Sequence, residues 1–460
     1  MSDPEAVILG TFPVAEDDAR RAARYAIEGS PADEVEVLIS GSTSGVTRYA
    51  SSQIIQNTVR NEIRAGVRVV VGDRSAVAGT NQLDSAHMRE VAARAVEAAR
   101  ASVPDADFPG LPRPEEVGQP ERVLRWDEAT VAADPRRRAS AVAEILGVTG
   151  ATSAAGVYET SAHAFGVFSS TGVDCFDAYS RCIATCLADN GDATGWAQAS
   201  SHAIDEVDVA SIAARALGKA ERGRGAVDAE PGTYEVVLEA PAVAEMLDYF
   251  AYVGFGAKQM IEGDSFLATR SGDKVAGEAV TVSDDVFHPL SVGIGFDLEG
   301  VPKRRVPVIE GGIAKGPVTD LRTGRKLGAP SSGHFSGSNE FGPYAFNVVL
   351  EPGDLSIEEL VAGVDRGFLV TRFHYVNVLD RHSTLLTGMT RDGTFRISGG
   401  EIAEPVHNFR FAQNVLDALS SATGIGREAA SFGPDWGSFG STVAPALRVG
   451  EFRFASKTSH

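Results

Sequence analysis

Apolar and polar positions repeat with two different periods along the first half of the chain. A helical period in Ala-rich stretches predicts helices at residues 16–28, 85–102, 134–146 and 205–219. Strict alternation predicts strands at residues 34–40, 46–52, 54–62, 67–71, 153–160, 164–170 and 174–187. We therefore expect an N-terminal α/β domain in which helices pack on a mixed or antiparallel sheet.

Strands dominate the second half of the pattern. Residues 234–238 alternate into an amphipathic run from Pro241 to Asp264, which predicts one helix. After Gly277 the pattern is strand and turn, apart from a helix predicted at residues 356–366 from its capping-box sequence. Residues 218–232 hold four glycines, alternating charges and a proline, which is typical of a linker. The expected fold class is α+β, with an N-terminal domain at residues 1–222 and a mainly antiparallel β-rich domain at residues 223–460.

Charge and composition argue against a nucleic-acid partner and a membrane span, and they favour a cytoplasmic location. With a net charge of −20 over 460 residues, the chain lacks the basic character that phosphate binding needs, so we expect no nucleic-acid partner. No apolar run approaches the roughly 18 residues of a membrane span, and residues 1–5 lack a signal peptide's basic start. Cys175, Cys182 and Cys186 make an odd count, which predicts reduced thiols in a cytoplasmic protein.

Short motifs follow one another in a fixed order along both halves. The main ones are Thr47-Arg48-Tyr49-Ala50, Val67-Arg68-Val69, Ser169-Ser170-Thr171-Gly172, residues 281–285, Phe296-Asp297-Leu298-Glu299-Gly300, residues 308–312 and Gly399-Gly400-Glu401-Ile402. Each motif alone is a weak signal, but the ordered set covers most of the chain. Together the set resembles the TldD/PmbA (TldE) family, the so-called modulators of DNA gyrase.

The resemblance implies that the family's catalytic residues are missing here. Catalytic members carry a His-Glu-x-x-x-His pair on the helix that ends in the tail found at residues 262–264, and a cysteine nearer the C-terminus. Gly254 and Phe255 stand where the first His and the Glu would be, Gln259 stands where the second His would be, and residues 424–441 contain no cysteine. Zinc needs imidazole, thiolate or carboxylate ligands, and a peptidase needs a base beside the bound water. We therefore expect no metal in this chain, and zinc in a catalytic partner subunit.

The resemblance also implies a role in a complex. The family pairs a catalytic zinc subunit with a related subunit that lacks the ligands, and the pair degrades or trims small, often unfolded peptides. This chain would then be a non-catalytic TldE-like subunit, in a heterodimer with a TldD-like subunit or in a homodimer. Two alternatives stay open. One is an independent enzyme with a site rebuilt around His374 and Arg391, together with His407 or His334; the other is a homodimer that binds peptides without cleaving them.

A strand at residues 372–377 supplies the main candidates for substrate binding. Alternation places Arg372, His374 and Val376 on one face, and Phe373, Tyr375 and Asn377 on the other. With Arg391 on a neighbouring strand, Arg372 and His374 predict a positive patch that binds a peptide carboxylate in a common cavity. A histidine satisfied within the sheet is the structural alternative.

Two further groups of polar residues have a structural and a functional interpretation. His334 lies in the Gly- and Ser-rich segment 331–338, which is typical of a flexible loop that faces a substrate. Asp284 with Asp285, and Asp297 with Glu299, have the spacing of paired acids. Their neighbours are turn formers and strands, so we interpret these acids as hairpin-corner residues that bond to the local backbone.

Overall fold

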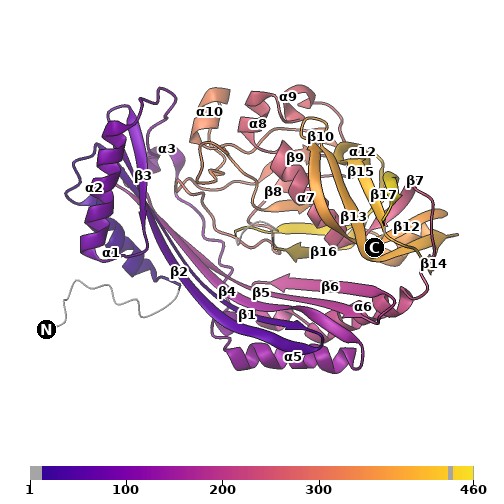
Figure 1. Cartoon of the computed structure of the whole chain (residues 1–460). Helices are drawn as coiled ribbons and strands as arrows, with labels where there is room; N and C mark the ends of the chain where they lie inside the picture. Colours follow the sequence, from indigo (N-terminus) through magenta and orange to yellow (C-terminus); the bar gives the residue numbers. More distant parts are fainter. Residues whose placement is uncertain (1–12, 434–438, 459–460) are drawn as a thin grey trace.

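The computed structural model describes residues 13–433 and 439–458. The two halves of the chain build one sheet each, and the second half lies against one face of the first sheet (Figure 1). Residues 1–5, which lack the basic start of a signal peptide, lie outside the described residues. Residues 434–438, part of the segment without cysteine, also lie outside them.

The first half forms a six-stranded antiparallel sheet in the order β3-β2-β1-β4-β5-β6. Its strands are β1 (Glu34–Ala50), β2 (Gln53–Val71), β3 (Arg74–Thr80), β4 (Ser153–Ser169), β5 (Asp174–Asp189) and β6 (Thr194–Ser201). Three of these strands are longer than predicted, because residues 34–50, 53–71 and 153–169 each form one strand where the sequence predicted two. Gly41 and Gly45 lie inside β1 and mark close approaches instead of turns. A Cβ on Gly45 would meet the Arg138 guanidinium at 2.3 Å, and one on Gly41 would meet the Val14 backbone nitrogen at 2.8 Å.

Four main helices cover the outer face of this sheet (Figure 1). They are α1 (Glu16–Ile27), α2 (Ser85–Ala101), α5 (Pro135–Thr149) and α6 (Val209–Arg222), with short turns at α3 (Pro114–Val117), α4 (Glu128–Val131) and η1 (Ile204–Glu206). The helix starts follow local chemistry. Asp134 caps α5 by accepting from the Arg137 amide, with Pro135 in the first turn, and Asp208 caps α6 in the same way. The predicted start of α6 at Asp205 was therefore early, because residues 204–206 form a separate 3₁₀ turn.

The second half forms an 11-stranded mixed sheet. Its strands are β7 (Gly232–Leu238), β8 (Val282–Asp284), β9 (Val306–Glu310), β10 (Ile313–Ala314), β11 (Val348–Leu350), β12 (Arg366–Asp380), β13 (Leu385–Ser398), β14 (Glu401–Pro405), β15 (Phe409–Asn414), β16 (Ala422–Phe432) and β17 (Thr442–Lys457). Most pairs are antiparallel, but β7 runs parallel to β12 and β11 runs parallel to β17. Because β17 also pairs with β7, the strands β7, β12, β13, β15 and β17 close into a ring.

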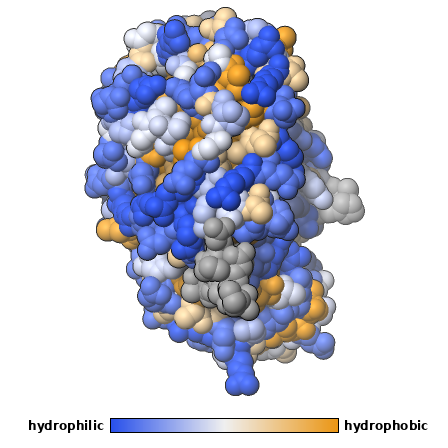
Figure 2. Space-filling model, turned by 90° about the vertical axis from the view of Figure 1, so that its left-hand side faces the viewer, coloured by the Kyte–Doolittle hydropathy of each residue, from blue (hydrophilic) through white to orange (hydrophobic). Residues whose placement is uncertain are grey.

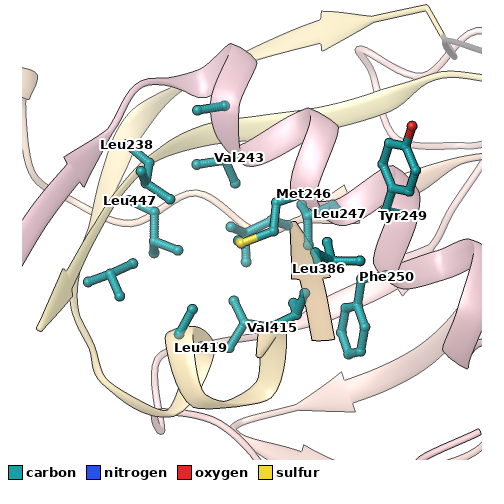
Figure 3. Packing of buried hydrophobic residues seen from close by; sticks show 14 of the residues in the cluster. Leu238, Val243, Met246, Leu247, Tyr249, Phe250, Leu386, Val415, Leu419 and Leu447 are labelled. Carbon is teal, nitrogen blue, oxygen red and sulfur yellow. The ribbon is translucent and has the colours of Figure 1, made fainter. Parts of the chain in front are cut away.

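The helices of the second half are α7 (Ala240–Gly254), α8 (Ala257–Glu262), α9 (Leu267–Arg270), α10 (Leu321–Leu327), α11 (Ile357–Ala362) and α12 (Val415–Ser420). Helix α7 is apolar on most of its surface and is buried on most sides, as such a helix must be. Figure 3 shows its side chains, among them Val243 and Met246, packed with Leu386 and Leu447 in one cluster. The amphipathic run predicted as one helix is therefore two helices, because the chain leaves α7 at Phe255 and restarts at Ala257.

The inner face of the first sheet meets the second half through a small apolar core. Val167, Cys175 and Tyr179 from the first half pack with Ile294 and Phe296 from the second. The view in Figure 2, turned toward the side that carries α1 and α2, is mainly hydrophilic, with hydrophobic residues in small scattered groups. Among the described residues, no helix combines the length and the apolar character that crossing a bilayer requires.

Candidate functional site

The three positions singled out on the α7–α8 segment lie inside the protein core. Gly254 ends α7, Phe255 caps it, and Gln259 lies in the middle of α8. The Gln259 Nε2 atom donates to the Phe341 carbonyl at 3.2 Å, and its Oε1 atom fills the space where a Cβ on Gly256 would lie. This packing explains why position 256 holds a glycine.

Phe255 belongs to an aromatic cluster. It is fully buried and meets Phe250 edge to face, with ring centroids 4.8 Å apart. Phe250 in turn stacks on Phe266 at 5.3 Å. Aromatic contacts of this kind contribute roughly 0.5–1.5 kcal/mol each beyond the area they bury. The segment therefore acts as a structural element of the domain core.

The residues present do not fit a zinc ion at this segment. Gly254 has no side chain and Phe255 has no donor atom, while Gln259 offers a neutral amide that already bonds to Phe341. Across residues 13–433 and 439–458, no group of three His, Cys, Asp or Glu side chains is placed to hold a metal. Whether a partner subunit carries zinc stays a prediction.

The strand at residues 372–377 does not alternate as predicted. Phe373 and Val376 both enter the main core, although the pattern placed them on opposite faces. The cause is a register irregularity between His374 and Asn377, where Tyr375 adopts a positive φ of 52° and is 75% exposed. Val376 therefore does not share a face with His374, and this part of the prediction was wrong.

Arg372 is held by its own domain and by the first half of the chain. Its Nε donates to the Oδ2 of the buried Asp392 at 2.6 Å, and its guanidinium lies 4.7 Å from the Trp196 ring. Thr194, on the same strand as Trp196, donates to the other Asp392 oxygen at 2.6 Å. Arg391 lies 3.8 Å from that carboxylate. The negative charge of the buried Asp392 thus partly offsets the positive charges of Arg372 and Arg391. The positive patch that the sequence predicted is therefore weaker than expected.

His374 and Arg391 do not line one cavity together. Arg391 lines a cavity of about 360 Å³ with Asp392, Thr194 and His407, and His374 is not among its lining residues. The half-buried His374 faces Met389 on the neighbouring strand instead, and its ring lies 4.3 Å from that of Tyr375. The structure brings Arg372 and Arg391 opposite each other but leaves His374 outside this cavity.

His334 is fully buried. Its Nε2 atom lies 2.9 Å from the Asp284 Oδ1, and its Nδ1 atom lies 2.9 Å from the Ser332 hydroxyl. Asp284 is buried too. Burial is the largest single influence and raises its pKa, but the His334 imidazole, the Lys303 charge and the Asn347 amide together lower the pKa overall. A ring enclosed in this way cannot reach a bound peptide, so the geometry corrects the substrate role predicted for His334.

Asp297 and Glu299 are more than hairpin-corner residues. Asp297 does accept backbone bonds from Glu299, Val301 and Phe335, as the structural interpretation requires. Burial raises the pKa of Asp297 to about 7 and that of Glu299 to about 8. Glu299 also accepts from the Arg68 Nη1 at 3.1 Å, and Arg68 bonds to Glu36, so this buried group joins the two halves of the chain.

A polar groove that was not predicted from the sequence runs along the inner face of the first sheet. Two adjoining cavities of about 310 and 320 Å³ share Ser42, Glu62 and His163. We call this feature the inner groove; its lining includes Ser40, Ser42, Ser44, Arg48, Gln56, Thr58, Arg60, Glu62, Arg64, Glu159 and His163 from the sheet, and Leu298, Ser336, Phe346 and Phe439 from the second half. Such a strip of hydroxyl, amide and charged groups can bond to the backbone of an extended peptide.

His163 is the imidazole at the floor of the inner groove. Its ring stacks on Tyr179 at a centroid distance of 4.9 Å. Burial, assisted by the charge of Arg181, lowers the pKa of His163 to about 3, so the ring is neutral at physiological pH. The signal for the groove was the recurrence of polar residues at every second position of 40–48, apart from Val46, and of 56–64. It was overlooked because residues 41–45 and 63–66 were left between the short strands predicted at 34–40, 46–52, 54–62 and 67–71.

Fold and site together define an α+β protein with two sheets and a polar groove along the inner face of the first. The family model described as the PmbA/TldA metallopeptidase C-terminal domain matches residues 231–456, and the model of metallopeptidase domain 1 matches residues 35–99. The chain belongs to this PmbA/TldD family.

Curated relatives agree with this membership, and a solved structure shares the fold. A metalloprotease of Methanothermobacter thermautotrophicus is 29% identical over 49% of this chain and 50% of its own length. A zinc metalloprotease TldD homolog of Saccharolobus solfataricus is 26% identical over 43% of this chain and 44% of its own. The chain thus spans about half the length of these curated relatives. The crystal structure of TldE from Thermococcus kodakarensis has the same fold, with a TM-score of 0.83, 21% identity and coverage of 96% of this chain and 99% of that one.

Proposed function

We propose that this chain is the non-catalytic, TldE-like subunit of a zinc metallopeptidase complex that processes or degrades small unfolded peptides. One observation carries the proposal. Gly254, Phe255 and Gln259, which the family resemblance assigns to the ligand and base positions, pack into the core, and the chain keeps the fold of TldE from Thermococcus kodakarensis. A subunit of this kind contributes binding surface, and its partner contributes the zinc.

The inner groove supports a role in holding substrate. It is open, polar and formed by parallel rows of side chains on β1, β2 and β4. Glu62, where the two cavities adjoin, and Arg64, in one of them, offer both charge signs, whereas Ser42 and Thr58 offer hydroxyl groups that accept or donate. An unfolded peptide presents a free backbone amide and carbonyl at nearly every residue, so it matches this lining better than a folded protein does.

The remaining features are consistent with a cytoplasmic subunit without a metal of its own. The cysteines at positions 175, 182 and 186 are buried, unpaired thiols. Burial raises the pKa of Cys175 and Cys182 to about 12, which keeps both protonated and unreactive. The net charge of −20 favours a peptide over nucleic acid as the bound polymer.

Reconstitution tests the proposal directly. The chain is co-expressed with a ligand-bearing relative from the same genome, and cleavage of an unfolded peptide is measured for each chain alone and for the pair. We expect co-purification, and cleavage only when the relative is present, with a chelator abolishing it. Zinc-dependent cleavage by this chain alone would refute the non-catalytic assignment, and failure to retain the relative would refute the pairing.

A further inference from the structure

The register of the first sheet sets the order of side chains across the inner groove. Residues that lie opposite each other in an antiparallel pair point to the same face. Ser42 of β1 lies opposite Glu62 of β2 and His163 of β4, and two positions earlier Ser40 lies opposite Phe165 of β4. The groove therefore has small hydroxyl side chains along β1, charged side chains on the β2 side, and an imidazole and a phenyl ring on the β4 side.

Aromatic side chains gather in one of the two cavities of the inner groove. Phe165, Leu298, Phe346 and Phe439 line the cavity of about 310 Å³, whereas Val46 is the only aliphatic or aromatic residue among the described residues that line the other. We call these four residues the apolar wall. Phe439 meets Phe165 and Phe346 edge to face, at centroid distances of 5.2 and 4.6 Å. All four are only partly buried, so the wall presents apolar surface to the cavity.

Contacts within the protein hold the apolar wall in place. The buried Lys303 ammonium lies 5.2 Å from the centre of the Phe346 ring and 5.4 Å from that of Phe439. The same ammonium donates to the Asn347 Oδ1 at 3.2 Å, and Lys303 is not among the residues that line the cavity. The rings are therefore fixed before a ligand arrives, and a ligand that packs on them pays little for ordering them.

His163 is the polar group beside the apolar wall. It is only 6% exposed, and it lines both cavities. Its ring stacks on Tyr179, but within the described residues no group hydrogen-bonds to its nitrogens. Buried polar groups normally have such a partner. A neutral imidazole has one donor and one acceptor nitrogen, which are the groups that bind a backbone carbonyl or amide.

We propose that the inner groove selects peptides by one apolar side chain, best an aromatic one, which packs against the apolar wall while His163 hydrogen-bonds to the peptide backbone beside it. This inference rests on the proposed function, and it adds a preference for sequence. Backbone contacts are the same for every residue of a peptide and cannot discriminate. The wall can, because an aromatic ring buries more apolar area there than a methyl group, and a carboxylate would lose its hydration without gaining a partner.

The same preference separates unfolded peptides from folded proteins. Large apolar side chains are mostly buried in a folded protein and become accessible when its chain is unfolded or cut. A groove that needs both a free backbone and an exposed aromatic side chain therefore binds unfolded segments and passes over folded surfaces. The charged residues of β2 at the other side of the groove leave the flanking peptide positions in a polar environment.

Calorimetry with matched peptides tests the preference. A short unstructured host peptide of Gly, Ser and Thr carries Phe, Ala or Glu at one central position, and isothermal titration needs no label that could itself pack on the wall. The Phe peptide should bind at least about tenfold more tightly than the Ala peptide, with a more negative heat-capacity change, and the Glu peptide should bind no more tightly than the Ala peptide. Equal affinities for Phe and Ala, or tightest binding of Glu, would overturn the preference and leave the substrate-holding role intact. Binding of none of the three would overturn both.

Substitution in the apolar wall tests the location. Phe346→Ala should reduce the affinity ratio of the Phe and Ala peptides to less than about threefold while the affinity for the Ala peptide stays the same. Phe165→Ala, from the other half of the chain, should do the same and serves if the first variant is unstable. Phe176→Ala is the matched control, because Phe176 is a partly buried phenylalanine on β5 that packs on the outer face of the same sheet. A ratio that survives in a folded wall variant, or that falls equally in the control, would overturn the assignment.

His163→Phe tests the backbone contact separately. The variant keeps a ring to stack on Tyr179 and removes both nitrogens. It should weaken binding of the Phe and Ala peptides alike, by about threefold or more, because the lost hydrogen bond goes to the backbone that both peptides share. Unchanged affinity for both peptides in the folded variant would overturn the role assigned to His163.

Discussion

Phe266 occupies the space into which a side chain at Gly254 would project. A Cβ built on Gly254 would lie 2.9 Å from the Phe266 Cε1 and 3.0 Å from its Cδ1. Contacts this short force the phenyl ring to move, and that ring stacks on Phe250 within the core. The position therefore cannot accept an imidazole without repacking the aromatic cluster.

Restoring the family motif should not restore a metal site. In the triple variant Gly254→His/Phe255→Glu/Gln259→His, overpacking and the loss of a buried phenyl ring should lower the free energy of unfolding by at least about 3 kcal/mol. Metal analysis after dialysis against zinc should find well under one ion per chain, as for the wild type. Gln259→His alone is the control for a single added imidazole. Stoichiometric zinc in a folded triple variant would show that the cluster accommodates the site.

Removing the Asp392 carboxylate should loosen the contact between the two halves. Asp392 is buried and bonds to Arg372 and Thr194, so Asp392→Asn leaves charged and polar groups poorly paired. We expect the free energy of unfolding to fall by about 1–3 kcal/mol in urea titrations. Arg391→Gln, at a position 39% exposed, should change it by less than about 0.5 kcal/mol. Equal effects of the two substitutions would contradict this assignment.

The stability of the protein should fall as the pH rises through neutrality, and Glu299 should cause part of that fall. Burial raises the pKa of Glu299 to about 8, above the value of about 4.3 in an unfolded chain. Between these values the folded chain holds a proton that the unfolded chain has released, so the free energy of unfolding decreases with increasing pH. Glu299→Gln should flatten the change in melting temperature between about pH 5 and about pH 8. Glu278→Gln, at an exposed glutamate, should leave the wild-type slope unchanged.

Peptide capture should depend on the inner groove more than on His374. Ser42→Tyr fills the groove where its two cavities adjoin, and we expect it to weaken binding of an unfolded peptide at least tenfold, or about 1.4 kcal/mol. His374→Ala should change the affinity less than twofold, as measured by fluorescence anisotropy with a labelled peptide. The opposite ranking would support the carboxylate patch that the sequence predicted on residues 372–391.

Much of the fold follows from local pattern. The starts of α2, α5 and α11 were predictable because capping residues mark them in the sequence. The length of β1 was not predictable, since glycines such as Gly41 and Gly45 commonly interrupt a strand. The glycine at position 45 is explained only by helix α5, whose Arg138 side chain occupies the space of a Cβ there. Arg138 lies 93 positions further along the chain. Long-range contacts of this kind leave no local signal.

The site was predictable where residue identity decides the chemistry. The absence of zinc ligands at Gly254, Phe255 and Gln259 is a property of composition, and geometry only explains how the space is used. The face assigned to Val376 failed because a single residue, Tyr375, takes a positive φ and shifts the alternation by one position. His334 resembled a loop histidine because its partner Asp284 is 50 residues away in sequence.

The pairing of β7 with β17 has a consequence for synthesis of the chain on the ribosome. Leu238 lies opposite Leu447, so the ring of strands cannot close until the last strand has been made. At the usual translation rate of about 5–20 residues per second, synthesis of the chain from Leu238 to Leu447 takes roughly 10–40 s. During this time the edge of β7 that pairs with β17 has no partner strand. The first sheet needs no residue beyond Ser201 and can fold during that interval. Its inner face then becomes a surface on which the second domain assembles, and truncation within β17 should leave the first domain folded and the second one exposed to proteolysis.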